Sequence, residues 1–333
     1  MTAVSPGSLY QTPKKFGLSI RTWRQIKEAL FGYALLAPAI ILLLVFEFYP
    51  LFFGMYISMC EWKLTCVKFI GLANYAKAFS DPAMWHSLLI TATYSVISVP
   101  VQLGLGLVLA YLLFQKVRGL AIFRMMFFMP YITTTVASAA VWAYLFNPTS
   151  GLINEAMSVI GLPGLKWLGE TKGIFAMLAG TVGLPLPAWA AGPSLALISL
   201  IIYTTWVFVG YDIVIFLGGL GNIPGELYDA AKVDGAEGWQ LFRYITLPLL
   251  SPTTFFLLII TVIGTFKAFN HIYIMTMGGP GDATTTSSIY IFNQLVVYGR
   301  YSYSAALSFV VFIVILALTI IQNKVAGSRV VYD

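Results

Sequence analysis

Residues 226–248 read ELYDAAKVDGAEGWQLFRYITLP, and this stretch decides how the chain is arranged. It fills most of a polar connection, 219–248, between two long apolar runs. Pro224, followed by the acids Glu226 and Asp229, indicates the start of a helix. Proline is favoured at such a start, and carboxylates in the first turn suit the positive end of a helix.

The same stretch predicts two short helices separated by a turn. Asp234-Gly235 marks the turn, because glycine supplies the backbone freedom that a sharp reversal needs. At helical spacing, the first helix has a small-residue face and the second an aromatic and aliphatic side: Leu227, Ala230 and Ala231, then Trp239, Phe242 and Ile245. Leu247-Pro248 starts the next apolar run. Such a pair is suited to docking into a partner's groove, and the alternative is an interfacial helix that packs on its own bundle.

Composition places most of the chain in a membrane. Of its 333 residues, 59% are hydrophobic and only 10% are charged, against roughly a quarter charged in soluble domains. The net charge is +6. The basic residues lie between apolar runs, so they indicate topology rather than nucleic-acid binding.

Six apolar runs are long enough to cross the hydrocarbon core, which takes about 20 residues. We expect all six to be helices, because a strand edge exposed to lipid leaves backbone groups unpaired. They lie at about 31–59, 87–114, 122–146, 194–218, 249–276 and 303–323. The sequence therefore predicts an all-α membrane protein with a transmembrane domain at 29–326 between two tails, 1–28 and 327–333.

Lysine and arginine set the expected orientation. With the N-terminus inside, the inner segments hold twelve of these residues and the outer segments seven. Since basic residues concentrate on the cytoplasmic side, we expect both tails and the 219–248 loop in the cytoplasm. The connection 147–193 is then extracytoplasmic.

Within that connection, Gly173 to Ala191 is semi-apolar and resembles an insertion. A seventh span there would place residues 226–248 outside. Pro185 and Pro187 favour a surface or re-entrant element instead.

Cys60 and Cys66 flank the end of the first apolar run. Two cysteines make no disulfide framework, and no cysteine or histidine cluster suggests a metal. A Cys60–Cys66 bridge in an extracytoplasmic loop and two free thiols both remain open.

The motif in the 219–248 loop resembles the EAA motif of bacterial ABC importer permeases, at the right spacing before the penultimate span. Asp229 stands where that family usually has glutamate. The resemblance implies a type I importer fold in which this loop couples to the ATPase through Glu226, Asp229, Ala230, Ala231, Asp234, Gly235, Ala236, Phe242 and Pro248.

The resemblance also implies the partners. A cytoplasmic ATPase dimer would bind ATP, since this chain has no G-x-x-x-x-G-K-[ST] phosphate loop. A second permease chain would complete the pore, and an extracytoplasmic binding protein would deliver the solute. The expected location is the bacterial cytoplasmic membrane.

A second resemblance, to carbohydrate-uptake permeases of the maltose and glycerol-phosphate type, covers most of the chain. It rests on Tyr49-Pro50, Phe69 to Tyr75, Arg124 with Pro130, Gly151 to Asn154, and Phe266 to Pro280. Asn270 stands where many relatives carry aspartate. The resemblance implies import of a sugar, an oligosaccharide or a glycerol-phosphate-like solute.

Sugar recognition calls for aromatic faces and amide or hydroxyl groups inside a span. The candidates for the solute path are Trp206, Tyr211, Asn270 and Tyr273. Asp212, Lys267 and His271 are weaker candidates, the first as a packing or gating residue. The simpler interpretation is that tyrosine and tryptophan near span ends are interface anchors.

Other interpretations have less support. An ABC permease for amino acids, polyamines or phosphate-type solutes shares the same machinery. A secondary transporter predicts inverted repeats, and the chain has no second copy of the 229–248 block. Gly104 and Gly106 predict close helix packing.

Overall fold

The computed structural model describes residues 14–15, 18–115, 119–187 and 190–327. Most of the two expected tails therefore lies outside the described residues. Within these residues, four helices are long and apolar enough to cross a membrane, and the number rises to six if each of two bent pairs is one span. This range agrees with the predicted all-helical membrane architecture.

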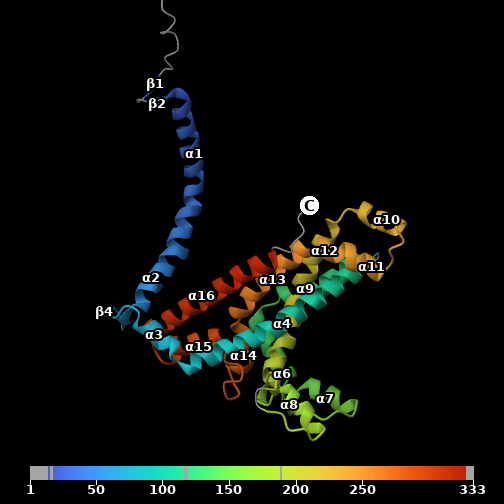
Figure 1. Ribbon diagram of the computed structural model, residues 1–333. Coiled ribbons are helices and arrows are strands. Elements are labelled where there is room, and N and C mark those ends of the chain that lie inside the picture. Colours follow the sequence, from blue (N-terminus) through green and yellow to red (C-terminus); the bar gives the residue numbers. More distant parts are fainter. Residues whose placement is uncertain (1–13, 16–17, 116–118, 188–189, 328–333) are drawn as a thin grey trace, which may run out of the picture.

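The first span is one long helix that extends away from the rest of the chain (Figure 1). It consists of α1 (Ile20–Leu43), the π-helical turn η1 (Leu44–Phe48) and α2 (Tyr49–Ser58). A short antiparallel pair, β1 (Lys14–Lys15) and β2 (Leu18–Ser19), precedes it. The helix thus begins inside the segment expected as a tail.

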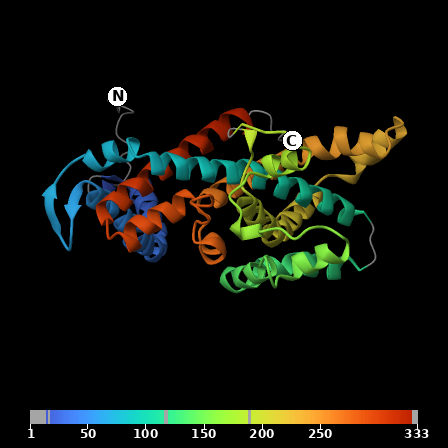
Figure 2. The ribbon, with the colours of Figure 1, turned by 90° about the horizontal axis from the view of Figure 1, so that it is seen from below.

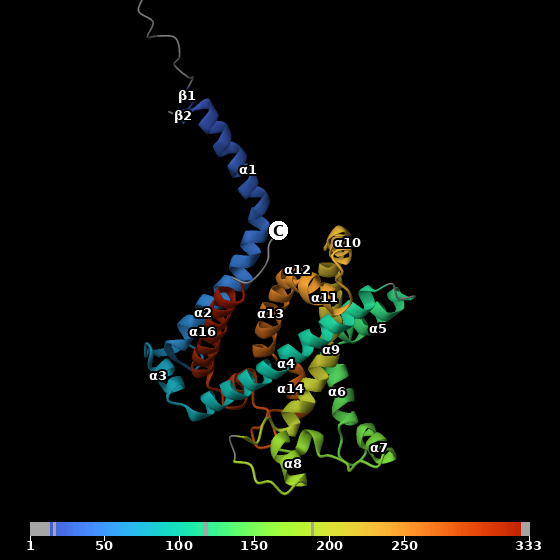
Figure 3. The same cartoon turned by 45° about the vertical axis from the view of Figure 1, so that its right-hand side comes forward.

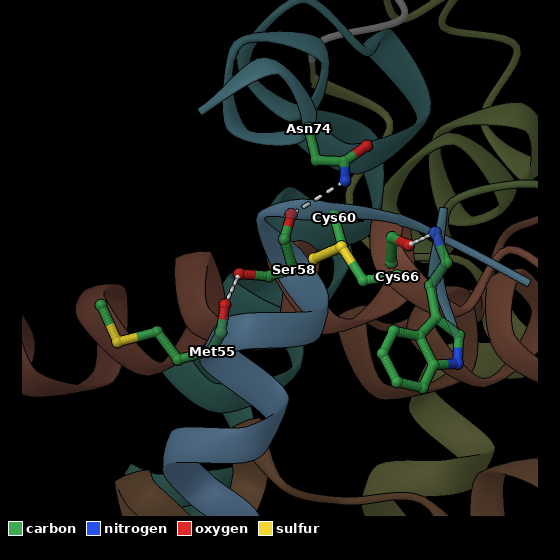
Figure 4. The surroundings of a disulfide bond; sticks show 7 residues. Met55, Ser58, Cys60, Cys66 and Asn74 are labelled. Atoms are coloured by element: carbon green, nitrogen blue, oxygen red, sulfur yellow. Dashed lines mark hydrogen bonds between the residues drawn. A yellow bond between two sulfur atoms is a disulfide. The ribbon is translucent and has the colours of Figure 1, made fainter. Parts of the chain in front are cut away.

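A disulfide closes the hairpin that follows the first span. The strands β3 (Cys60–Trp62) and β4 (Cys66–Phe69) pair antiparallel, and Cys60 is bonded to Cys66. Figure 4 shows the bridge beside the end of α2, where Asn74 Nδ2 donates to the carbonyl of Ser58 at 2.9 Å. Asn74 belongs to α3 (Ala73–Phe79). The structure therefore resolves the open question of the two cysteines in favour of a bridge.

The centre of the molecule is a pair of long helices, α4 (Pro82–Phe114) and α9 (Leu195–Gly221). A Cβ at Gly106 of α4 would lie 2.8 Å from the Cβ of Asp212 in α9, so only glycine allows this approach. Gly104 has no atom within 4 Å of such a Cβ. The predicted close packing is therefore confirmed at Gly106 and wrong at Gly104.

The expected third span, 122–146, is not one straight helix. It is α5 (Leu120–Ile132) and α6 (Thr135–Leu145), bent by 95°. Thr133 and Thr134 have extended ψ values of 142° and 123°, which interrupt the helix between the two parts. Pro130 and the three threonines 133–135 mark this position in the sequence, although the run as a whole is apolar enough for a span.

The connection 147–193 contains α7 (Leu152–Val159), the 3-10 turn η2 (Trp167–Gly169) and α8 (Ile174–Thr181). The helix α8 has eight residues, too few to cross about 30 Å of hydrocarbon. In the described part of this connection the structure therefore supports the surface element over a seventh span. Figure 3 shows α7 and α8 at the opposite end of the molecule from α10.

The polar loop folds as α10 (Gly225–Val233), and then α11 (Trp239–Leu241), the π-helical turn η4 (Phe242–Thr246) and α12 (Leu247–Leu249) run on together. The Trp239–Leu249 helix meets α13 (Ser251–Phe266) at 63°. The expected helix boundary at Leu247-Pro248 is therefore wrong, because the bend lies after Leu249.

The expected fifth span, 249–276, also breaks. Helix α13 ends at Phe266, and α14 (Asn270–Thr276) begins after Phe269, whose φ and ψ of −137° and −60° are not helical. The chain then continues through α15 (Ser287–Phe292), the π-helical turn η5 (Asn293–Val297) and α16 (Tyr301–Val325). The last of these is the sixth expected span.

Asp81 caps α4 and ties it to α15 and α16. Its carboxylate accepts the Ala83 N–H at 3.0 Å and the hydroxyls of Tyr290 and Tyr303 at 2.6 and 2.5 Å. Burial raises the pKa of the Asp81 carboxyl, but the tyrosine hydroxyls and the N–H groups of Ala83 and Met84 outweigh it and hold that pKa below its ordinary 3.8.

The core consists of three buried clusters along this bundle. One joins α4, α6, α9, α14 and α15, and it includes Tyr94, Phe146 and Tyr203. A second joins α4, α9 and α13 toward the α10 end, around Phe216 and Leu257. A third joins α3, α4 and α16 near the disulfide. In Figure 2 the light-blue strands of the disulfide hairpin and the orange helices of the polar loop lie at opposite ends.

Candidate functional site

A cavity of about 310 Å³ lies among α4, α5, α6, α9, α13 and α14. Its wall combines aromatic rings with hydroxyl, amide and carboxylate groups, among them Tyr94, Tyr131, Thr204, Phe208, Tyr211, Asp212 and Asn270. Tyr131 stacks on Tyr211, with ring centroids 5.0 Å apart. An apolar wall with a few polar groups is typical of a small-molecule site.

A buried hydrogen-bond network connects three helices at the wall of this cavity. The Tyr94 hydroxyl lies 2.6 Å from Thr204 Oγ1 and 3.0 Å from His271 Nε2. Thr204 Oγ1 also lies 3.2 Å from the same ring nitrogen. Because each polar atom has a partner, the network fixes α4, α9 and α14 relative to one another.

Asp212 and Gln102 form a second buried polar pair. Gln102 Nε2 donates to Asp212 Oδ2 at 2.6 Å, and both side chains are almost wholly shielded from solvent. The other carboxylate oxygen, Oδ1, has no hydrogen-bond partner. The sequence indicated a packing or gating role for Asp212, and in the structure Asp212 is a fully buried residue among those that line the cavity.

The break between α13 and α14 also lies at the cavity. Lys267, Ala268 and Phe269 form the break, and all three line the cavity with Asn270. Irregular backbone at membrane depth is tolerated where it lines a cavity or is buried in protein. Discontinuous transmembrane helices commonly form the solute site of a transporter at such a break.

Two of the four predicted path residues, Tyr211 and Asn270, line the cavity. The other two lie outside its lining. Trp206 packs on Trp142, with ring centroids 5.3 Å apart, and borders a separate apolar hollow beside α5. Tyr273 packs on Phe269 and Phe292, with centroids 5.3 and 5.0 Å away.

The polar loop presents α10 to its surroundings. Glu226, Asp229, Ala230 and Asp234 are exposed, while Ala231 is half-buried. Asp229 lies beyond the first turn, so its expected role at the helix start is wrong. It pairs with Lys232 at 3.2 Å instead.

The predicted turn after α10 is confirmed. Gly235 has φ of +84°, in the left-handed region that favours glycine. The N–H of Ala236 donates back to the carbonyl of Ala231 at 2.9 Å, which closes the end of the helix.

One contact joins the two helical parts of the polar loop, and another fixes the loop to a membrane helix. The Tyr228 hydroxyl lies 3.0 Å from Thr246 Oγ1, joining α10 to η4. The Phe242 ring lies edge-on to Tyr111 of α4, with centroids 4.8 Å apart. The expected anchoring by aromatic residues is therefore present at Phe242, whereas Trp239 is largely exposed. Pro248 lies within α12, one residue before the bend.

Sequence reasoning missed Tyr228 and Val233. Tyr228 lies inside the quoted stretch, directly before Asp229, and only the fold brings it to Thr246. Val233 is 88% exposed at the end of α10. The available sequence signal for Val233 was an apolar residue placed between Lys232 and Asp234. Among the described residues, no three histidine, cysteine or acidic side chains form a metal site.

Comparison with known proteins identifies the family. The model of the binding-protein-dependent transport system inner membrane component matches residues 102–329. The chain belongs to this family. As an inner membrane component, it is a transport subunit of an ABC transporter.

Relatives of this inner membrane component span nearly its whole length. It is 32% identical to the trehalose/maltose transport system permease protein MalF of Thermococcus litoralis, covering 91% of this chain and 96% of MalF. It is also 32% identical to the lactose transport system permease protein LacF of Rhizobium radiobacter, covering 90% and 94%.

A solved structure shares the fold. The bacterial alginate ABC transporter, in complex with an alginate pentasaccharide-bound periplasmic protein, aligns with a TM-score of 0.74 and 24% identity. The alignment covers 91% of this chain and 96% of that one. The inner membrane component therefore has the fold of an ABC importer permease.

Proposed function

We propose that this chain is the pore-forming permease subunit of an ATP-driven importer for a carbohydrate or a glycerol-phosphate-like solute. The observation that carries the proposal is the exposed helix α10, joined through Tyr228 and Thr246 to the helix that continues into the cavity wall. A push on α10 is thereby transmitted toward the cavity.

The solute class is supported by relatives and by the cavity together. The relatives' names give trehalose, maltose and lactose as their solutes. The cavity is lined by the partly exposed aromatic residues Tyr131, Phe208 and Tyr211, beside polar groups at Thr204 and Asn270. Rings and hydrogen-bonding groups suit a sugar, whose faces are apolar and whose edges carry hydroxyls.

The partners of the proposed importer follow from its mechanism. A cytoplasmic ATPase dimer binds ATP and seats α10, a second permease chain completes the pore, and an extracytoplasmic binding protein delivers the solute. The solved complex of the alginate transporter with a periplasmic protein supports the last of these.

In the proposed orientation, the chain spans a bacterial cytoplasmic membrane with both termini and the 219–248 loop on the cytoplasmic side. The Cys60–Cys66 bridge lies at the opposite end of the molecule from α10. Disulfides persist mainly in oxidising compartments. A disulfide on the extracytoplasmic side is therefore consistent with α10 on the cytoplasmic side.

The coupling role is tested by Val233→Glu, with Val182→Glu as its control. Val233 ends α10 and is 88% exposed, whereas Val182 follows α8 and is 74% exposed. The two helices lie at opposite ends of the molecule (Figure 3). The two variants make the same substitution, and each places the new carboxylate at a solvent-exposed position. Each is expressed with the partner permease, the ATPase and the binding protein.

We expect Val233→Glu to reduce co-purification of the ATPase and ATP-dependent sugar uptake, because a charge enters the docking surface. Val182→Glu should retain both. Equal behaviour of the two variants would contradict the coupling role of α10. Uptake confined to amino acids or polyamines would leave coupling intact and refute the carbohydrate assignment.

A further inference from the structure

Three residues form the end of the cavity that lies farthest from the polar loop. The helices α4 and α9 both run toward that loop, since Tyr111 of α4 packs on Phe242 and α9 leads directly into α10. Tyr94 and Thr204 are the first residues of these two helices in the cavity lining. The chain runs away from the loop along α13, and His271, near the start of α14, is the last lining residue on that segment.

A hydrogen-bond network joins these three outermost residues to one another. The Tyr94 hydroxyl, Thr204 Oγ1 and His271 Nε2 lie 2.6, 3.0 and 3.2 Å apart, and all three side chains are almost wholly buried. Farther from the polar loop along α9 and α14, Leu200 and Met275 belong to a buried apolar cluster. The cavity therefore ends at the network, and packed side chains lie beyond it.

The neighbouring residue Tyr203 ties the other broken span to the same place. Its hydroxyl lies 2.8 Å from Ser138 Oγ and donates to the carbonyl of Thr135 at 3.1 Å. Both partners belong to α6, the second half of the span that bends by 95°. Adjacent residues of α9, Tyr203 and Thr204, therefore hold the second halves of both interrupted spans, α6 and α14.

In the proposed orientation, this end of the cavity faces the extracytoplasmic side, from which the binding protein delivers the solute. The solute must then pass between α4, α6, α9 and α14 to reach the cavity. These helices separate only if the hydrogen bonds of the network break. One neutral hydrogen bond changes an equilibrium constant by only about two- to tenfold, so a small network of this kind suits a closure that opens in every transport cycle.

We propose that Tyr94, Thr204 and His271 form a latch that holds the outer end of the cavity closed in the resting transporter. The three are positioning residues, because they act by holding helices together. The inference rests on the proposed function and adds to it the control of access to the same cavity.

The test measures access to the cavity from outside. Thr261 lines the cavity on α13, on the polar-loop side of the latch. Because the two cysteines of the chain are bonded to each other, Thr261→Cys supplies one reactive thiol. The variant is reconstituted with the second permease and the ATPase dimer in lipid vesicles, without the binding protein. A charged, membrane-impermeant methanethiosulfonate is added on the extracytoplasmic side, and labelling is followed by the mass of this chain.

Tyr94→Phe and Thr204→Val each remove one hydroxyl of the latch with little change of shape, and Tyr303→Phe is the matched control. Tyr303 is also buried and its hydroxyl donates to Asp81, but it lies outside the cavity lining. We expect each latch variant to speed labelling of the introduced thiol by about two- to tenfold, the effect of one hydrogen bond. Tyr303→Phe should leave the rate unchanged.

Unchanged labelling in both latch variants overturns the inference. Equal acceleration in Tyr303→Phe overturns it too, because that result would show a general loosening of the bundle. Loss of assembly with the second permease and the ATPase in both latch variants assigns the network a structural role and overturns the inference equally. Uptake of trehalose, maltose and lactose by the unmodified transporter is measured separately. Failure to take up any of them would count against the proposed carbohydrate function, whereas the labelling rates decide the latch.

Discussion

Replacing Gly210 with alanine tests the packing of α9 on α5. A Cβ at this position would lie 1.9 Å from the carbonyl oxygen of Phe127 and 2.6 Å from its carbonyl carbon. Real Cβ contacts are not shorter than 3.0 Å, so the two backbones must separate by about 1.1 Å. Neither atom belongs to a flexible side chain, and the contact cannot be relieved by a rotamer change.

The magnitude follows from two opposing effects. Overpacking of this kind costs about 1–3 kcal/mol, whereas alanine in place of glycine favours the helix by ~1 kcal/mol. Gly218, on the same helix, has no atom within 4 Å of a Cβ. Gly218→Ala therefore keeps only the gain, and the difference between the two variants isolates the clash.

Unfolding of the purified chain in mixed detergent micelles, followed by graded addition of SDS, measures this difference. Gly210→Ala should unfold at a lower SDS fraction than Gly218→Ala, by about 1–3 kcal/mol in unfolding free energy. Equal stability of the two variants would refute the close approach of α9 to α5.

Three further predictions concern the ends of the molecule. Asp81 has a lowered folded pKa, so its contribution to stability is present above pH 3.8 and is lost as the pH falls through that lowered value. The melting temperature should therefore fall more steeply below about pH 4 in the native chain than in Asp81→Asn. Parallel curves of melting temperature against pH would contradict this. A membrane-impermeant maleimide–polyethylene glycol should shift the chain's mass only after reduction, and labelling without reductant would show free thiols at Cys60 and Cys66. Gly235→Val should strain the left-handed turn by about 1–2 kcal/mol and lower ATPase co-purification, whereas Gly225→Val, at a position with ordinary φ, should lower it less; equal losses would argue against the turn.

Local chemistry made the helical part of the polar loop predictable. Pro224 starts α10 and Gly235 ends it, since both effects act within a few residues. The long apolar runs likewise predicted α4, α9 and α16, because hydropathy over about 20 residues is a property of the sequence alone.

The cavity depended on features that hydropathy does not report. The runs 122–146 and 249–276 each have the length and overall hydropathy of one span, yet each is broken, at Thr133-Thr134 and at Lys267–Phe269. Those interruptions redirect the chain and decide which side chains meet. Tyr211 and Asn270 therefore line the cavity, whereas Trp206 and Tyr273, chosen by residue type, point to other neighbours.

The pairing of Asp212 with Gln102 joins residues 110 positions apart. A single sequence contains no signal for such a pair, because nothing local links the two positions. Gly106 was recognisable as a packing glycine, but its partner was not.

The first span has a consequence for production of the protein. In the helix Trp23–Ser58, the most apolar window has no residue buried within the chain. Stability from this span must come from lipid or from another subunit, and binding to the folded state raises stability by mass action. The yield of intact chain in a cell should then track the supply of its neighbours, so that copies made in excess become targets of membrane proteases.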